Sequence, residues 1–157
     1  MGIEQDIQQT KGFRNERQKI CVNLLYSSSW LQERIKLFLQ SEGITPQQYN
    51  ILRILRGSGK PISTLQIRER MLDKMSDTSR IVERLLKKEL VEKTICVTDK
   101  RLVDVVISPK GLDVLKRLDD RNNELDSIPA ALSEEEATIV NVLLDKMRDK
   151  AQVEPIK

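Results

Sequence analysis

The chain has 157 residues, of which 32% are charged and 39% hydrophobic, and it contains two cysteines and no histidine. The lack of histidine excludes His-dependent triads and histidine zinc sites, and no glycine-rich phosphate loop is present, so we expect no enzyme, metal or cofactor. No apolar run reaches the ~18 residues of a membrane helix, and two cysteines make no disulfide framework, which predicts a cytoplasmic protein.

The first third of the chain is predicted to contain a polar tail and two helices. We expect residues 1–12 to form a flexible tail. From Ile20 to Ser41, apolar residues recur at spacings of three, four and seven, which indicates a helix that ends at Gly43. A second helix begins after Thr45, because Gln48 three residues later completes a capping box.

The centre of the chain contains two short helical patterns and then a charged hairpin. The first pattern covers Ser63–Leu72 and the second covers Met75–Leu90. Alternating strands follow at residues 91–97 and 102–108, joined by a polar tip at Thr98–Arg101. This order predicts a winged helix-turn-helix, in which the second helix enters the major groove of DNA.

Two further helices are predicted after the hairpin. Ser108 caps a helix that runs to about Ser127, and Ser133 with Glu136 forms a capping box for the last one. Residues 151–157 are expected to be frayed. The predicted fold is therefore mostly α with a small β-hairpin wing, flanked by helices on both sides.

Positive charge is concentrated in the centre of the chain. Residues 53–117 hold 16 Lys and Arg against 9 Asp and Glu, whereas residues 118–157 hold 5 against 10. The excess coincides with the predicted helix-turn-helix, as binding to the phosphate backbone requires. A solvated charged surface is the alternative interpretation of the same distribution.

With these motifs the sequence resembles the MarR family of bacterial transcriptional regulators. The resemblance covers about residues 45–118 and rests on the stretches ITPQQYNILRIL, SRIVERLLKKELVEK and TDKRLVDVVISPKG. It implies that the chain binds double-stranded DNA as a homodimer. The implied organisation is a single domain at 13–150, with the winged helix-turn-helix at 45–108 and dimerisation helices at about 13–42 and 109–150.

Two positions in the second helix of the motif are unusual. The family generally has Gly-Leu at the end of this helix, where this chain has Glu89-Leu90. Lys88 or Glu89 must then adopt the chain-reversing left-handed conformation, which costs about 1 kcal/mol without glycine. The alternative is that the helix runs slightly longer. Asp77 near the helix start is favoured by the helix dipole; it would oppose a phosphate but could accept from a cytosine amino group.

The candidate DNA contacts lie on the outer face of this helix and at the wing tip. We expect Arg80 to contact a base, because Arg pairs bidentately with guanine, and Arg84 and Lys87 to contact phosphates. The resemblance places Arg101 at the minor groove. The remaining predicted contacts are Ser76, Asp77 and Ser79 on the helix, and Lys100 at a phosphate with Asp99 holding the tip.

The resemblance also implies a small-molecule effector in a pocket between the winged lobe and the dimerisation helices. Tyr26, Trp30 and Tyr49 are candidate pocket residues, with a place in the core as the alternative.

One branch of the family senses hydroperoxides through a cysteine placed like Cys21. That branch surrounds the thiol with tyrosines, which this chain replaces by Leu25, Ile35 and Pro46. Because the activating hydrogen bonds are then missing, we expect Cys21 to be a small core residue.

The sequence thus predicts a dimeric, sequence-specific regulator acting on an inverted-repeat operator, as a repressor released by a small ligand. The alternatives are a peroxide-sensing regulator that uses Cys21 and a winged-helix protein-interaction module.

Overall fold

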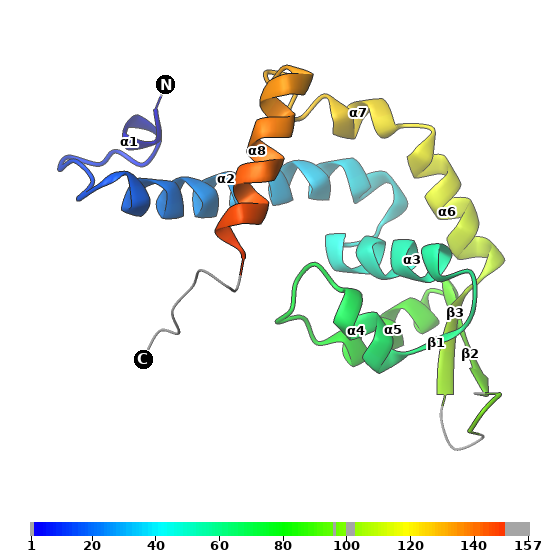
Figure 1. The fold of residues 1–157 in the computed structure, drawn as a ribbon. Coiled ribbons are helices and arrows are strands. Elements are labelled where there is room, and N and C mark those ends of the chain that lie inside the picture. Colours follow the sequence, from blue (N-terminus) through cyan, green and yellow to red (C-terminus); the bar gives the residue numbers. More distant parts are fainter. Residues whose placement is uncertain (1, 96, 100–102, 150–157) are drawn as a thin grey trace. The chain divides into compact units, whose positions relative to one another are not determined.

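The computed structural model describes residues 2–95, 97–99 and 103–149, which form two compact units (Figure 1). The first unit comprises residues 1–122 and the second comprises residues 123–157. The single domain expected over 13–150 stays a prediction. Within the second unit, the last helix has no buried side chain.

The helices and strands follow the predicted order, and the predicted fold class is confirmed. The first unit contains α1 (Ile3–Asp6), α2 (Glu16–Leu39), the 3-10 helix η1 (Gln40–Glu42), α3 (Pro46–Ser58), β1 (Ile62–Ser63), α4 (Thr64–Arg70), α5 (Thr78–Lys87), β2 (Val91–Ile95), β3 (Val103–Ile107) and α6 (Pro109–Asp119). They are followed by α7 (Asn122–Asp126), at the boundary, and α8 (Glu134–Met147).

The N-terminal segment differs from the predicted flexible tail because it contains the short helix α1. Ile3 is buried, and the carboxylate of Glu4 lies 2.7 Å from the Nζ of Lys19 on α2. The ion pair connects this segment to α2, and it does not follow from a local sequence pattern.

Three helices begin at the predicted capping boxes. The backbone N–H of Gln48 donates to the Thr45 hydroxyl at 3.2 Å, while the Gln48 side chain accepts from the Thr45 N–H at 3.1 Å. The same reciprocal pair opens α4 at Ser63 and α8 at Ser133. Each box satisfies two backbone donors that a helix start would otherwise leave without partners.

A three-stranded antiparallel sheet, in the order β1-β3-β2, supports the helices of the first unit. The hairpin of β2 and β3 was predicted, but β1 was not, because its two residues overlap the capping box at Ser63. Ile62 pairs with Val105 and Val91 pairs with Ile107. Ile95, by contrast, is 70% exposed, so the far half of the hairpin extends away from the core (Figure 1).

The core of the first unit lies between this sheet and helices α3 to α6. Its fully buried side chains are Leu39, Ile51, Leu52, Ile62, Ile67, Met71, Leu85, Val91, Val105, Leu115 and Leu118. At the start of α6, a Cβ built on Gly111 would lie 2.2 Å from the carbonyl oxygen of Leu90. Only glycine permits this close approach of α6 to the chain between α5 and β2.

Helix α6 ends earlier than the sequence predicted. It was expected to continue to about Ser127, but it stops at Asp119, and Leu125 lies on the separate helix α7. Asp119 and Asp120 place negative charge at the helix C-terminus, which the helix dipole disfavours.

The long flanking helices carry large apolar side chains that nothing in their own unit covers. On α2, only Phe38 and Leu39 are buried, and α8 has no buried residue. Its exposed apolar residues are Ile139, Val140, Val142, Leu143 and Met147. We find no helix in the described part of the chain that is long and apolar enough to cross a membrane.

Candidate nucleic-acid interface

The turn between α4 and α5 is built by polar side chains. The Asp73 carboxylate accepts from the Met75 N–H at 3.0 Å and from the Ser76 hydroxyl at 2.9 Å. The Leu72 N–H donates to Oδ1 of Asn50 on α3 at 2.9 Å. These bonds fix the turn against α3 and hold Met75 and Ser76 outside the helix that the sequence predicted for them.

Helix α5 therefore begins at Thr78, with Asp77 as its N-cap. Oδ1 of Asp77 accepts from the backbone N–H of Arg80 at 3.2 Å. The predicted contacts Ser76 and Asp77 thus have structural roles in this turn, since one donates to Asp73 and the other caps the helix.

The inner and outer faces of α5 agree with the predicted periodicity. Thr78, Val82 and Leu85 are buried. The exposed side chains are Ser79, Arg80, Glu83, Arg84 and Lys87. Four of these five were predicted DNA contacts, and the structure presents them on one side of the helix.

The cations on this outer face are not neutralised by their own helix. Glu83, the acidic residue between them, lies 2.7 Å from the Nζ of Lys93 on β2. Within the described part of the chain, Arg80, Arg84 and Lys87 form no salt bridge. The outer face of α5 is therefore a positive surface that can receive an anionic partner.

The helix end contains the reversal that the sequence required. Glu89 has φ +62°, its N–H donates to the Leu86 carbonyl at 2.9 Å, and the Leu90 N–H donates to the Leu85 carbonyl at 3.0 Å. This pair of bonds is a Schellman motif with glutamate where glycine is usual. The prediction that Lys88 or Glu89 adopts the left-handed conformation is confirmed, and the residue is Glu89.

The sequence reasoning missed a basic residue on α4. Arg68 and Thr64 of α4, together with Ser76–Ser79 at the start of α5, line a surface hollow of about 420 Å³. Arg68 is exposed and one helical turn after Thr64. Its spacing on the first helix of the motif could have identified it, because it lies on the side that faces the start of α5.

At the wing, the described residues include only one of the three predicted contacts. Asp99 is exposed at the hairpin tip. Lys100 and Arg101 lie outside the described residues, so the wing assignments stay predictions.

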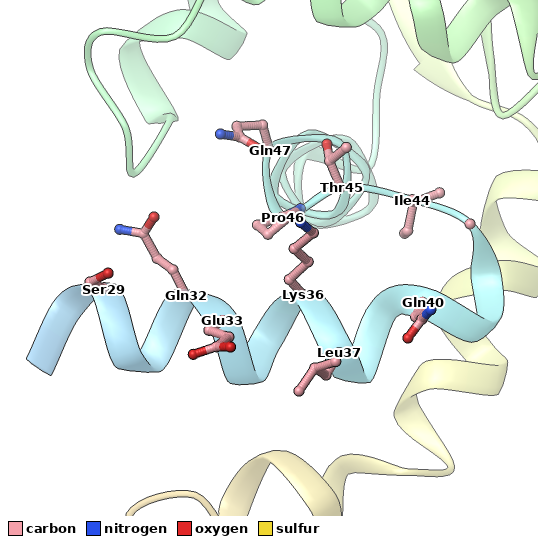
Figure 2. A pocket seen from close by; sticks show the side chains of 11 residues that line it. Ser29, Gln32, Glu33, Lys36, Leu37, Gln40, Ile44, Thr45, Pro46 and Gln47 are labelled. Atoms are coloured by element: carbon pink, nitrogen blue, oxygen red, sulfur yellow. The ribbon is translucent and has the colours of Figure 1, made fainter.

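A second surface feature, a hollow of about 890 Å³, lies between α2 and the start of α3. Figure 2 shows Gln32 and Lys36 of α2 projecting toward the N-terminal end of α3. The hollow is lined by Ser29, Gln32, Glu33, Lys36, Leu37, Gln40 and residues 43–47. A neighbouring hollow of about 450 Å³ reaches the α4–α5 turn and includes Leu31, Ile35, Met71 and Leu72.

The predicted pocket residues do not line either hollow. Tyr49 is buried in the core with Arg53 over its ring, and this is the alternative that the sequence left open. Tyr26 and Trp30 are more than 40% exposed on α2, where Arg34 lies over the Trp30 ring. The two hollows combine polar and apolar side chains, and the assignment of Tyr26 and Trp30 to an effector pocket stays a prediction.

The expectation that Cys21 is a core residue is wrong for the single chain. Cys21 is a free, exposed cysteine on α2. The reason is that α2 has little of its own unit packed against its N-terminal half.

The geometry of α4, α5 and the hairpin defines a winged helix-turn-helix of the DNA-binding type. The sequence profile of the MarR family matches residues 44–103. This match assigns a MarR-family domain, of the kind found in transcription regulators, to that part of the chain.

Individual relatives agree with this assignment. The chain is 25% identical over 119 residues to the HTH-type transcriptional regulator MhqR of Bacillus subtilis (strain 168), covering 74% of this chain and 81% of that protein. A mutant of MarR from E. coli, solved with operator DNA, is similar with a TM-score of 0.78 and 18% identity over 88% of this chain and 99% of its own. The organohalide-sensing regulator RdhR, solved with 2,4-dichlorophenol, has a TM-score of 0.78 and 19% identity over 95% and 96%.

Proposed function

We propose that the protein is a homodimeric, sequence-specific DNA-binding regulator that acts on an inverted-repeat operator as a repressor released by a small ligand. The observation that carries this proposal is the outer face of α5. Arg80, Arg84 and Lys87 point outward there, while Glu83 is held by Lys93 at 2.7 Å. A helix surface whose cations have no salt-bridge partner among the described residues suits the phosphate backbone and the base edges of a major groove.

The proposed contacts divide by chemistry. Arg80, close to the start of α5, reads a guanine, and Arg84 and Lys87 bind phosphates, with Ser79 beside them. Arg68 on α4 is added as a phosphate contact because it lines the hollow next to the start of α5. At the wing, Arg101 enters the minor groove and Lys100 binds a phosphate, as the family resemblance implies.

The proposed dimer is supported by the apolar side chains that α2 and α8 leave exposed. On α8, Leu143 is 57% exposed and Val142 60%, and Leu25 on α2 is 74% exposed. A second copy of the chain would cover exposed apolar side chains of this kind on each helix. We expect Leu143→Asp to sediment as a monomer, whereas Leu65→Asp, an equally exposed leucine on α4, stays dimeric. A dimeric Leu143→Asp protein would refute the role of α8.

The proposed effector site is the pair of hollows between α2, α3 and the α4–α5 turn. Gln32 and Pro46 border both hollows, and Leu72 belongs to the turn that precedes α5. A ligand there would release DNA only by binding more tightly to the form in which the two copies of α5 do not fit successive grooves. One relative, RdhR, has been solved with a chlorinated phenol, which supports a ligand site in this fold.

A peroxide-regulated version of the same function is the second candidate, because the Cys21 thiol is exposed. In that case peroxide would release DNA from the wild-type protein and leave Cys21→Ser bound. Equal binding of both proteins with and without peroxide would exclude it.

The main test is selection of binders from a random duplex pool of about 30 base pairs, at two salt concentrations. Enrichment of an inverted repeat with half-sites about one helical turn apart would support the dimeric regulator. Arg80→Ala should then lose discrimination between bases, while Arg34→Ala on α2 keeps it. Equal weakening on specific and random duplexes would make Arg80 a phosphate contact, and salt-insensitive or absent binding would favour a protein-interaction module.

A further inference from the structure

The two lysines at the end of α5 have different environments. Lys87 is exposed on the outer face of the helix. Lys88 turns toward the body of the first unit, where its Nζ donates to the carbonyl oxygen of Gly43 and lies 3.4 Å from Oε1 of Gln48. These acceptors are 45 and 40 residues away in the sequence, so the contact joins α5 to the corner between α2 and α3.

Both acceptors of Lys88 are held in place by hydrogen bonds that do not involve the lysine. Gly43 closes η1 with φ +62°, and its N–H donates to the Gln40 carbonyl at 3.1 Å. Gln48 is only 4% exposed, and its Oε1 also accepts from the Thr45 N–H at 3.1 Å. The corner therefore offers two positioned oxygens rather than a flexible surface.

Helix α6 also forms hydrogen bonds to the corner between α2 and α3 and to the end of α5. Arg117 donates two hydrogen bonds, of 3.0 and 2.7 Å, to the carboxylate of Glu42, which precedes Gly43. The Nζ of Lys110 donates to the backbone carbonyl of Lys88 itself at 2.9 Å. The last turn of α5 is thus held by its side chain toward α2 and by its carbonyl toward α6.

From these contacts we propose that Lys88 is a positioning residue that sets the orientation of α5 relative to α2 without touching DNA. The two ends of α5 are held differently, since the start depends on Asp77 and the α4–α5 turn, whereas the Lys88 side chain connects the other end to α2. Because α2 belongs to the proposed dimer interface, the Lys88 contact influences how the two copies of α5 are spaced. This inference rests on the proposed function.

The matched pair Lys87 and Lys88 provides the test. Lys88→Met keeps the length of the side chain and removes the donor, Lys88→Arg keeps a donor, and Lys87→Met is the control for a phosphate contact. Each protein is titrated with the selected operator, with operators whose half-sites are one base pair closer or further apart, and with a random duplex, over a series of salt concentrations.

We expect Lys87→Met to weaken binding to every duplex and, because a dimer contains two copies of Lys87, to lower the salt slope by about two. Lys88→Met should keep the wild-type salt slope and the affinity for random duplex. It should lose about tenfold in affinity for the operator, and the three half-site spacings should become nearly equivalent. Lys88→Arg should behave as the wild type.

Three results would overturn the proposal. A salt slope lowered by about two in Lys88→Met would make Lys88 a phosphate contact in both copies of the chain. Unchanged operator affinity and spacing preference would leave it without a positioning role, even if the unfolding temperature fell. Equal losses in Lys88→Arg and Lys88→Met would show that hydrogen bonding is not the cause. If the wild-type protein itself enriched no operator, the proposed function would fail first, and this inference would fall with it.

Discussion

Glu89 is the residue whose backbone conformation conflicts most directly with its identity. It has φ +62° at the end of α5, in the position where a Schellman motif favours glycine. Its carbonyl oxygen also accepts from the Ser108 hydroxyl at 2.7 Å, so the reversed conformation is fixed by α6. The substitution Glu89→Gly should therefore relieve strain without moving the chain.

The magnitude follows from two contributions. A residue with a Cβ in the left-handed region is disfavoured by about 1–2 kcal/mol, and the greater freedom of glycine in the unfolded chain offsets about half of this. The substitution also removes the Glu89–Lys110 ion pair of 3.2 Å, whose side chains are 82% and 58% exposed. An ion pair with that exposure contributes little. We expect a net stabilisation of about 1 kcal/mol, or roughly 2–4 °C in the unfolding midpoint.

The assay is thermal and urea unfolding of wild type, Glu89→Gly and Glu89→Ala at one protein concentration, because dimerisation would make the midpoint depend on concentration. Glu89→Ala removes the same ion pair but keeps the Cβ, so the difference between the two variants isolates the backbone effect. If Glu89→Gly were no more stable than Glu89→Ala, the strain argument would be refuted.

Three further predictions concern stability. Gly111→Ala should destabilise by about 3 kcal/mol, because its Cβ would lie 2.2 Å from a backbone oxygen, whereas Gly57→Ala on α3 meets nothing within 4 Å and should be neutral or mildly stabilising in urea unfolding. Thr78→Val should stabilise the fold by about 1 kcal/mol in urea unfolding, because the buried Thr78 hydroxyl has no hydrogen-bond partner among the described residues. If the variant were instead destabilised by about 1 kcal/mol, the hydroxyl would have to form a hydrogen bond in the folded protein. The guanidinium of Arg117 lowers the pKa of Glu42 below its ordinary value of 4.5, so the ionised carboxylate stabilises the fold above that pH, and the contribution is lost as the pH falls through the lowered value. Glu42→Gln should thus unfold more easily than wild type at neutral pH. If the difference in unfolding free energy between the two proteins persisted in acid, the ionised Glu42 carboxylate could not be its cause.

Local signals explain why most of the helix starts were predictable. A capping box needs two side chains three residues apart, so Thr45 and Ser133 identified the starts of α3 and α8 from sequence alone. The start of α5 was placed too early because Asp73 binds Met75 and Ser76 through its side chain, which competes with helix formation. The apolar and polar periodicity of the segment does not reveal that competition.

Contacts between distant residues account for what the sequence did not predict. The spacing of Arg80 and Arg84 placed both on the outer face of α5, because helical periodicity is local. The diversion of Glu83 to Lys93 depends on how β2 lies beside the helix. Trp30 was a candidate pocket residue by its position and chemistry. It does not line the hollow between α2 and α3, which is formed by side chains that the crossing of the two helices brings together.

Contacts between distant residues also decide how much of the chain's positive charge is available to DNA. Residues 53–117 hold a net charge of +7, but several cations there are held in internal contacts: Arg56 by Asp119, Lys93 by Glu83, Lys110 by Glu89 and Arg117 by Glu42. The proposed phosphate contacts are Arg68, Arg84, Lys87 and Lys100, four in each chain.

A homodimer would then make about eight phosphate contacts, and the logarithm of its affinity should fall with the logarithm of salt with a slope of about −7. If the four cations of each chain that are held in internal ion pairs also bound phosphates, the dimer would make about sixteen contacts and the slope would be about −14. Titration of the selected operator at four or more salt concentrations separates the two values. A slope near −14 would mean that the internal ion pairs open on DNA, whereas a slope near −7 means that they remain closed and hold α5 in place.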